Sequence, residues 1–269
     1  MDNLKIVLSE KLGEKTTSYS DELVKDMLDR IGHPDCELRD DLIFTTFAKG
    51  LHQEEFRVDQ FLYLANAVLD RDLLRVGLGQ VGDSTLTRSF TSLLVFLLLT
   101  YHYEEKSLYF GILEKRHLDY FKIVGQSYLS LEKDLRAFSE SYGWVHAPAH
   151  FADYYAIFLC YEGLEKEEWE NFLDQLELFF KREKHVFTAG ESERLAQLIY
   201  RPYLKGQLPH RVLVDWLRNL EFSKLEATDY MAFLNFSHFL SAVYIEMTNC
   251  QQLDDDLKEV IYRLVTIWE

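Results

Sequence analysis

Apolar residues recur at helical spacing along almost the whole chain, and this periodicity constrains the fold more than any other feature. In the segment 165–184 six apolar side chains stand at i, i+3, i+4, i+7, i+10 and i+11, and they are Trp169, Phe172, Leu173, Leu176, Phe179 and Phe180. Because an α-helix turns once every 3.6 residues, these side chains form one stripe on a helix. Glutamates open the segment and basic residues close it, which suits the helix dipole.

Similar stripes predict further helices. The last one carries Leu253, Leu257, Val260, Ile261, Leu264 and Trp268. A helix capped by Ser20 ends at Gly32, and another opens at Pro34 and Asp35 with Leu38, Leu42 and Ile43 facing inward. We also expect helices near 56–70, 84–101, 107–130, 133–142, 145–161, 190–204, 210–220 and 227–248. No segment alternates with period two, and the chain has only 4 prolines and 12 glycines, so we predict an all-α fold without a sheet.

Two N-terminal segments resemble each other. IGHPDCELRDDLIFTTFAKGL and VGDSTLTRSFTSLLVFLLL each place a turn, an arginine and an apolar helix in that order, with Arg39 and Arg88 at corresponding positions. Their separation is close to the ~40–47 residues of a HEAT or armadillo repeat. Since one helix pair cannot bury its apolar face alone, we predict an α-α superhelix of stacked antiparallel helix pairs, HEAT/armadillo-like. It forms a single helical-repeat domain over 1–269, in which the helices of 166–269 continue the stack.

Composition excludes several partners. A net charge of −16, from 29 basic and 45 acidic residues, repels phosphate backbones and anionic lipid, so we expect no nucleic acid and no membrane as partner. The most apolar stretch, 93–99, is far shorter than the ~20 residues of a spanning helix and predicts a buried core helix. Cys36, Cys160 and Cys250 lack CxxC spacing, and no apolar run of signal-peptide length opens the chain. We therefore expect an acidic cytoplasmic protein with reduced thiols.

One segment differs from an ordinary amphipathic helix, because His146, His150 and Asp153 stand at i, i+4 and i+7. If a helix starts near Val145, the three share one face and offer a divalent metal site or an acid–base group. If Pro148 is the first helical residue, His146 lies outside the helix. The alternative to both is structural: such residues often cap a helix or bond to a neighbouring turn.

Arg39, Asp40 and Arg88 also allow two interpretations. They tie successive repeats together, or their helix starts converge with the segment 146–153 on one side of the stack and line a pocket. The chain has no GxGxxG, GxxxxGK[ST], GxSxG or HExxH motif. The glycine-rich stretch 77–82 follows no strand and is expected to be a loop between helices.

Four runs of residues resemble motifs of the DUF2785 family, in the same order and at similar spacing over residues 20–165. They are CELRDDLIF, GLGQVGDSTLTRSF, LEKDLRAF and GWVHAPAHFAD. The family is bacterial and has no established function, so the resemblance implies a HEAT- or armadillo-related helical fold and no particular activity. The polar positions that it marks are Arg39, Asp40, Asp83, Arg88, Glu132, Asp134, Arg136, Trp144, His146, His150 and Asp153.

Two functional hypotheses follow. The favoured one is a binding module without a cofactor, whose polar pocket holds a peptide or a small polar ligand. Its predicted site consists of Arg39, Asp40, Asp83, Arg88, Arg136, Trp144, His146, His150 and Asp153. The alternative is a metal-dependent hydrolase in which His146, His150 and Asp153 hold a divalent metal. A pocket role for His150 predicts that His150→Ala leaves the fold intact, whereas a clear loss of stability would make His150 part of the architecture.

Overall fold

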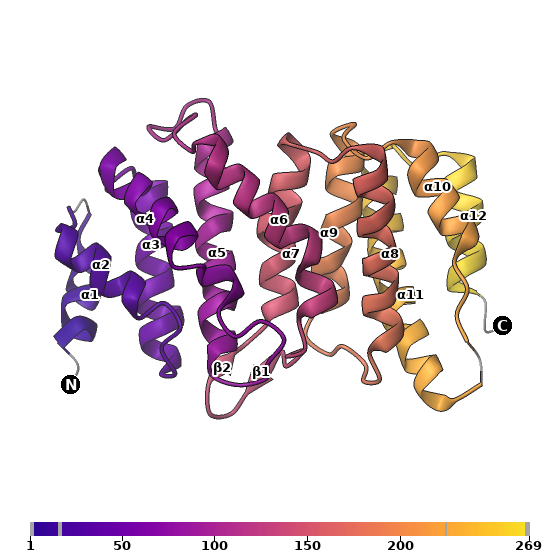
Figure 1. Ribbon diagram of the computed structural model, residues 1–269, viewed down its shortest axis with the longest axis horizontal. Helices are drawn as coiled ribbons and strands as arrows, with labels where there is room; N and C mark the ends of the chain where they lie inside the picture. The colour runs from indigo at the N-terminus through magenta and orange to yellow at the C-terminus, as the bar shows by residue number, and fades with distance from the viewer. Residues whose placement is uncertain (1–2, 16–17, 224, 267–269) are drawn as a thin grey trace. The chain divides into compact units, whose positions relative to one another are not determined.

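Helices dominate the structure. The computed structural model describes residues 3–15, 18–223 and 225–266, and 69% of these described residues are helical. The all-α prediction is confirmed. The expectation of no sheet is corrected by one small antiparallel ribbon, in which β1 (Phe138–Ser139) pairs with β2 (Gly143–Trp144), as Figure 1 shows.

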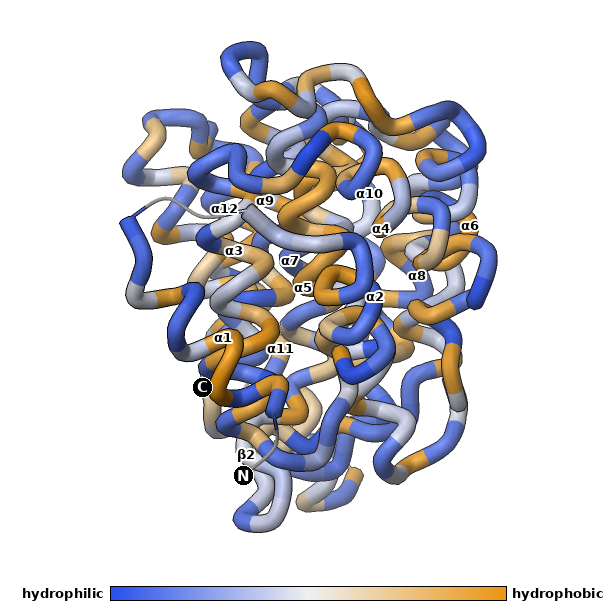
Figure 2. The backbone as a smooth tube through the Cα atoms, turned by 90° about the vertical axis from the view of Figure 1, so that its left-hand side faces the viewer, coloured by the Kyte–Doolittle hydropathy of each residue, from blue (hydrophilic) through white to orange (hydrophobic). Residues whose placement is uncertain are grey.

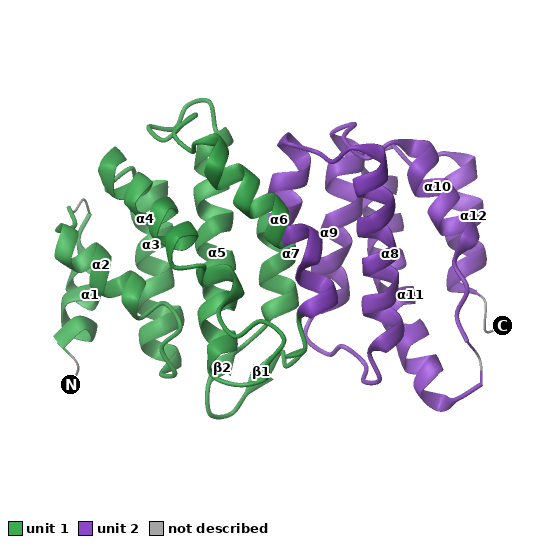
Figure 3. Ribbon diagram, viewed as in Figure 1, with its two compact units in different colours: residues 1–124, 132–154 green, residues 125–131, 155–269 purple. Residues whose placement is uncertain are grey.

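The chain divides into two compact units, which Figure 3 distinguishes by colour. Unit 1 comprises residues 1–124 and 132–154, and unit 2 comprises residues 125–131 and 155–269. The boundary passes through two helices, α6 (Lys115–Leu131) and α7 (Ala147–Tyr161), so each of them contributes to both units. A single helical-repeat domain over the whole chain remains a prediction.

Unit 1 is a set of packed helices in which α-helices whose numbers differ by two contact each other. Its elements before α6 are α1 (Asn3–Gly13), α2 (Asp21–Asp29), the π-helix η1 (Glu37–Phe44), α3 (Thr45–His52), α4 (Val58–Asp70), the 3₁₀ turn η2 (Leu73–Arg75) and α5 (Ser84–Tyr103). Helix α2 contacts α4, and α3 contacts α5. The predicted cap of α2 is confirmed, because Ser20 Oγ accepts a hydrogen bond from the Leu23 amide at 3.2 Å.

Helix α5 forms the centre of this unit. Its apolar residues, orange in Figure 2, include the predicted core stretch, of which every residue except Phe96 is buried. By length and composition α5 passes as a membrane span, but 72% of its most apolar window is buried inside the structure. Burial against neighbouring helices therefore accounts for its apolar sequence, as expected for a core helix.

Unit 2 contains α8 (Lys166–Arg182), α9 (Glu191–Leu204), α10 (His210–Asn219), α11 (Ala227–Asn249) and α12 (Asp255–Val265). Helix α9 packs along α11, α8 along α10, and α10 along α12. This is again the pattern of stacked helix pairs. All six members of the stripe predicted in α8 are buried. In α12 the stripe is buried from Leu257 to Leu264, and its last member, Trp268, lies outside the described residues.

Two predicted helices differ from the structure. Helix α6 begins at Lys115 instead of near 107, and residues 104–114 form turns that His102 helps to hold by accepting the Leu113 amide at 3.0 Å. The segment 133–142, predicted as a helix, instead consists of an irregular stretch, strand β1 and the turn that leads to β2. The side chains directly after α6 explain why this segment is not helical.

Candidate functional site

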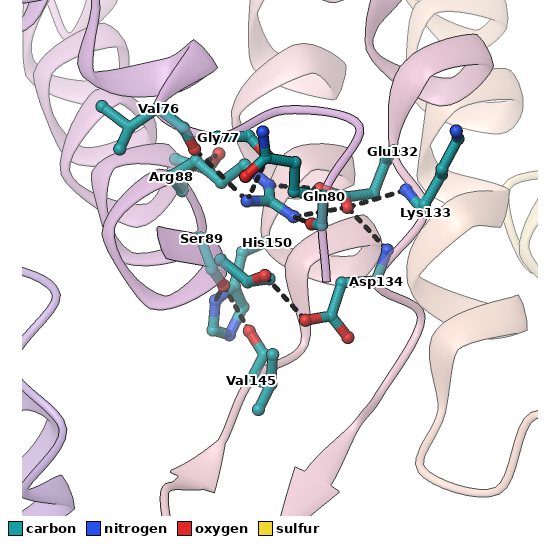
Figure 4. Close-up of polar contacts among 12 residues, drawn as sticks. Val76, Gly77, Gln80, Arg88, Ser89, Glu132, Lys133, Asp134, Val145 and His150 are labelled. Atoms are coloured by element: carbon teal, nitrogen blue, oxygen red, sulfur yellow. Dashed lines mark hydrogen bonds and ion pairs between the residues drawn. The ribbon is translucent and has the colours of Figure 1, made fainter. Parts of the chain in front are cut away.

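The Arg88 side chain of α5 is completely buried, and protein acceptors engage all five of its N–H donors (Figure 4). Its Nε and Nη2 form a bidentate pair with the Glu132 carboxylate at 2.6 and 2.7 Å. Nη1 donates to the carbonyls of Val76 and Gly77 at 3.2 Å, and Nη2 also donates to that of Gln80 at 2.9 Å. Arg88 thus fastens the glycine-rich loop and Glu132, the residue that follows α6, to α5.

Two carboxylates determine the path of the chain after α6. Glu132 Oε1 accepts the amides of Lys133 and Asp134 at 2.9 and 2.8 Å, so a helix cannot continue through them. Asp134 in turn accepts Thr85 Oγ1 at 2.6 Å and the Arg136 guanidinium at 2.6 and 2.8 Å. Burial tends to raise the pKa of Asp134, but the hydrogen bonds from Arg136 and Thr85 outweigh it and hold this pKa below its ordinary value.

Arg39, in η1, holds the ribbon from the other side. Its buried guanidinium donates to the carbonyl of His33 at 2.8 Å and to the carbonyls of Tyr142 and Trp144 in the ribbon. It also lies over the Phe90 ring of α5, with Cζ 4.5 Å from the centroid. Arg39 is therefore shared by η1, α5 and the ribbon.

Asp40 and Asp83 flank this arrangement. Asp40 Oδ1 lies 2.7 Å from Arg39 Nε in an ion pair. Burial raises the pKa of Asp40 to about 6 even though the Arg39 charge opposes the change. Asp83, at the exposed start of α5, hydrogen-bonds the Tyr142 hydroxyl and so raises the pKa of that phenol.

His146 lies just outside helix α7, which starts at Ala147, so the helix start near Val145 is corrected. His146 adopts a left-handed backbone conformation with φ 45°, and its carbonyl accepts the His150 amide at 2.9 Å. It therefore occupies the residue before the helix, and Pro148 is the second helical residue, where a missing N–H costs nothing. Only His150 and Asp153 of the predicted trio lie on the helix.

The His150 ring is buried beside Ser89 of α5, with Nδ1 2.8 Å from Ser89 Oγ (Figure 4). Ser89 Oγ also donates to the Val145 carbonyl. A carbonyl only accepts, so the single hydroxyl proton goes to Val145 and His150 Nδ1–H donates to Ser89. Ser89 is consequently not a nucleophile activated by His150; the pair joins α5 to the start of α7.

Five rings run from the protein interior to its surface, and we call them the ring row: Phe90, His150, His146, Trp144 and Phe138. Neighbouring centroids lie 5.3, 5.7, 4.9 and 5.3 Å apart in that order. Trp144 and His146 are stacked, with 22° between their planes. The inner members are buried, whereas Trp144 is 45% and Phe138 58% exposed. The row therefore ends in an exposed aromatic pair.

The structure brings the predicted motifs together within unit 1, because η1, the start of α5, the ribbon and the start of α7 all meet there. This convergence on one region was predicted. Sequence reasoning missed four residues of it, namely Ser89, Phe90, Phe138 and Tyr142. Phe138 ends the run LEKDLRAF, and Tyr142 directly precedes the run GWVHAPAHFAD. Because the segment 133–142 was expected to be helical, nothing in the sequence indicated that Phe138 packs against Trp144.

Metal binding by His146, His150 and Asp153 gains no support. Within residues 3–15, 18–223 and 225–266, no group of three or more His, Cys, Asp or Glu side chains has the arrangement of a metal site. The two nearby arginines Arg88 and Arg136 pair with Glu132 and Asp134. The metal-dependent hydrolase remains an untested prediction from the sequence.

Comparison with known proteins gives one match. A family model described as a protein of unknown function (DUF2785) matches residues 74–245. The match begins after the run CELRDDLIF and extends past residue 165 through most of α11, so it includes helices that the motif resemblance did not cover. No curated protein and no solved structure matches the chain.

Proposed function

Because the chain belongs to the DUF2785 family, whose function is unknown, we propose its function from the geometry of unit 1: the protein is a binding module that holds a peptide on the outer end of the ring row. One observation carries the proposal. Trp144 and Phe138 are about half exposed, yet they pack on each other and on the buried His146 ring.

The exposed pair is supported by rigid contacts. Arg39 binds the backbone carbonyl of Trp144 itself at 3.1 Å, and Asp134 and Glu132 fix the chain that leads into the ribbon. A large ring that is already held in place loses little conformational entropy when a partner covers it. Tryptophan in such a position is the residue type that most often dominates binding energy at interfaces.

The open position of these rings favours a peptide over a small polar ligand. A small ligand usually has most of its surface enclosed by its site. Trp144 and Phe138 instead lie half exposed on a ribbon whose two strands have two residues each, and there an apolar peptide side chain can cover both rings. Covering them removes apolar area from water at about 25 cal/mol per Å².

The predicted site residues then divide by role. Trp144 contacts the ligand, and the buried rings of His146 and His150 pack behind Trp144 in the ring row. The remaining residues fix the surrounding backbone, and they are Arg39, Asp40, Asp83, Arg88 and Arg136. Asp153 is mostly buried on α7 and has no ligand contact in this proposal. The module needs no cofactor, and we place it in the cytoplasm because of its acidic composition and unpaired cysteines.

The test is selection from a random peptide library displayed on phage, with the parent protein and Trp144→Ala immobilised in parallel. We expect the parent to enrich related sequences that the variant does not enrich. A synthetic enriched peptide, titrated calorimetrically, should bind Trp144→Ala and Phe138→Ala at least about tenfold more weakly. Leu178→Ala, which truncates an exposed apolar residue of α8, serves as the matched control.

The proposal fails if the parent enriches no related peptides, or if the Trp144→Ala variant enriches the same ones. It also fails if Leu178→Ala weakens binding as much as Trp144→Ala does. Because Trp144 is half exposed, its truncation should leave the melting temperature close to that of the parent, and a circular dichroism melt verifies this.

A further inference from the structure

A second site-like feature lies within unit 2. A groove of about 490 Å³ runs between the C-terminal half of α7 and α9. It is lined by Ile157, Cys160, Tyr161, Tyr200, Arg201, Leu204 and Lys205. The lining has two cations, two phenol rings and no carboxylate, which is unusual for a chain with net charge −16.

The two cations of the groove are not neutralised by acidic neighbours. Arg201 lies in the last turn of α9, and Lys205 is the C-cap residue of this helix, four positions later. Among the described residues, neither has a carboxylate within ion-pair distance. Elsewhere in the same unit Lys181 pairs with Glu177 and Lys166 with Glu170. Arg201 and Lys205 therefore give the lining of the groove two positive charges, while burial and the nearby Glu246 carboxylate both act to raise the pKa of the Tyr200 phenol.

Both cations line the same groove as the Cys160 thiol. The positive charges of Arg201 and Lys205 each act to lower the pKa of the Cys160 thiol, although burial, the larger effect, raises it. The Lys205 Nζ is also 5.7 Å from the Tyr161 ring centroid, so the apolar wall and the charge are adjacent.

We propose that this groove binds a small organic anion. Its acidic group lies between Arg201 and Lys205, and its apolar body lies on the rings of Tyr161 and Tyr200. Arginine and lysine together suit a phosphate or carboxylate oxygen, since both donate charge-assisted hydrogen bonds. This site lies within the region matched by the family model and does not depend on the peptide site of unit 1.

Calorimetric titration with phenyl phosphate tests the proposal, because this probe combines an anionic group with an apolar ring. Inorganic phosphate and phenol, the two halves of the probe, are titrated separately. We expect phenyl phosphate to bind at least about tenfold more tightly than either half, because charge and apolar wall act together. Arg201→Met and Lys205→Met should each weaken binding about tenfold or more.

Lys258→Met, which neutralises an exposed lysine of α12 outside the groove, is the matched control and should bind the probe as the parent does. The proposal is overturned if phenyl phosphate does not bind, or if it binds Arg201→Met and Lys205→Met as tightly as Lys258→Met. Lys205 is exposed, so Lys205→Met should keep the parent's melting temperature, and it decides the question alone if Arg201→Met is unstable.

Discussion

At the scale of single residues, the most consequential group is the buried Arg88–Glu132 pair, because both side chains are fully buried. Arg88→Met removes the cation and leaves Glu132 as an uncompensated buried charge. We expect a loss of about 3–5 kcal/mol in the free energy of unfolding, measured by urea denaturation.

The double variant Arg88→Met, Glu132→Gln is the informative comparison. It removes both charges, so it should recover part of the stability that Arg88→Met loses. If Arg88→Met is as stable as the parent, the pair does not hold the glycine-rich loop and the chain that follows α6 in place.

The structure changes the effect on stability that we expect from His150→Ala. Its ring is buried, bonded to Ser89 and packed edge-on against Phe90. His150→Ala leaves the Ser89 hydroxyl without this partner and opens a cavity, so we expect a loss of about 1–3 kcal/mol. A thermal melt beside the parent measures it, and an unchanged melting temperature would restore a pure pocket role.

Asp40 predicts a pH dependence. Burial raises its pKa in the folded state to about 6, above the value of 3.8 that applies when the chain is unfolded. The stability contributed by protonated Asp40 is therefore fully present below about pH 4 and is lost as the pH rises through about 6. We expect Asp40→Asn, which stays neutral, to gain about 1–3 kcal/mol relative to the parent between pH 4 and 7.

Urea unfolding of both proteins at several pH values measures this difference. Asp41→Asn, at the exposed neighbouring position, is the control and should show a much smaller trend. A difference between Asp40→Asn and the parent that stays constant from pH 4 to 7 would contradict the raised pKa.

At the scale of elements, helices with a complete apolar stripe were predictable and irregular backbone was not. The stripe of α8 fixed that helix, because burial of its six members requires helical spacing. The segment 133–142 also contains helix-forming residues, but Glu132 and Asp134 bind backbone amides and the side chains of distant residues instead. Contacts that join positions about 45 residues apart cannot be read from local spacing.

The ribbon depends on one glycine whose conformation is easy to test. Gly143 has φ 69°, and a Cβ added there would lie 2.8 Å from the Cβ of Cys36, the residue before η1. Gly111 has a similar φ of 72° with nothing within 4 Å. Gly111→Ala should therefore cost only the backbone strain of about 1–2 kcal/mol, and Gly143→Ala should cost clearly more.

Thermal melts of the two variants separate strain from close approach. Gly143→Ala should also weaken peptide binding, because it displaces the backbone that carries Trp144. Equal losses of stability in the two variants would mean that the Cys36 contact is easily relieved, and the ribbon would then be less firmly held than we infer.

At the scale of the whole molecule, the sequence predicted the class of fold and the grouping of its polar motifs but not their division of labour. The types and the order of the residues predicted that Arg39, Arg88 and the segment 146–153 lie close together. Only the structure distinguishes the saturated, buried arginines from the exposed Trp144, since burial is a property of tertiary packing. The groove at Arg201 and Lys205 had no sequence signal, because two basic residues one turn apart usually form a solvated helix face.

Burial also predicts where the molecule is most stable. Helix α7 is buried from Ala147 to Cys160 with the exception of Ile157, and α5 is buried along most of its length. In α1, by contrast, only Leu4 and Leu8 are buried. Amides in fully packed helices exchange only through large opening events, whereas those of sparsely packed terminal helices exchange through local fraying. Hydrogen exchange followed by mass spectrometry should therefore find the slowest exchange in α5 and α7 and fast exchange in α1. Exchange in α7 as fast as in α1 would show that the buried polar network of Ser89, His150 and Arg39 does not hold the site together.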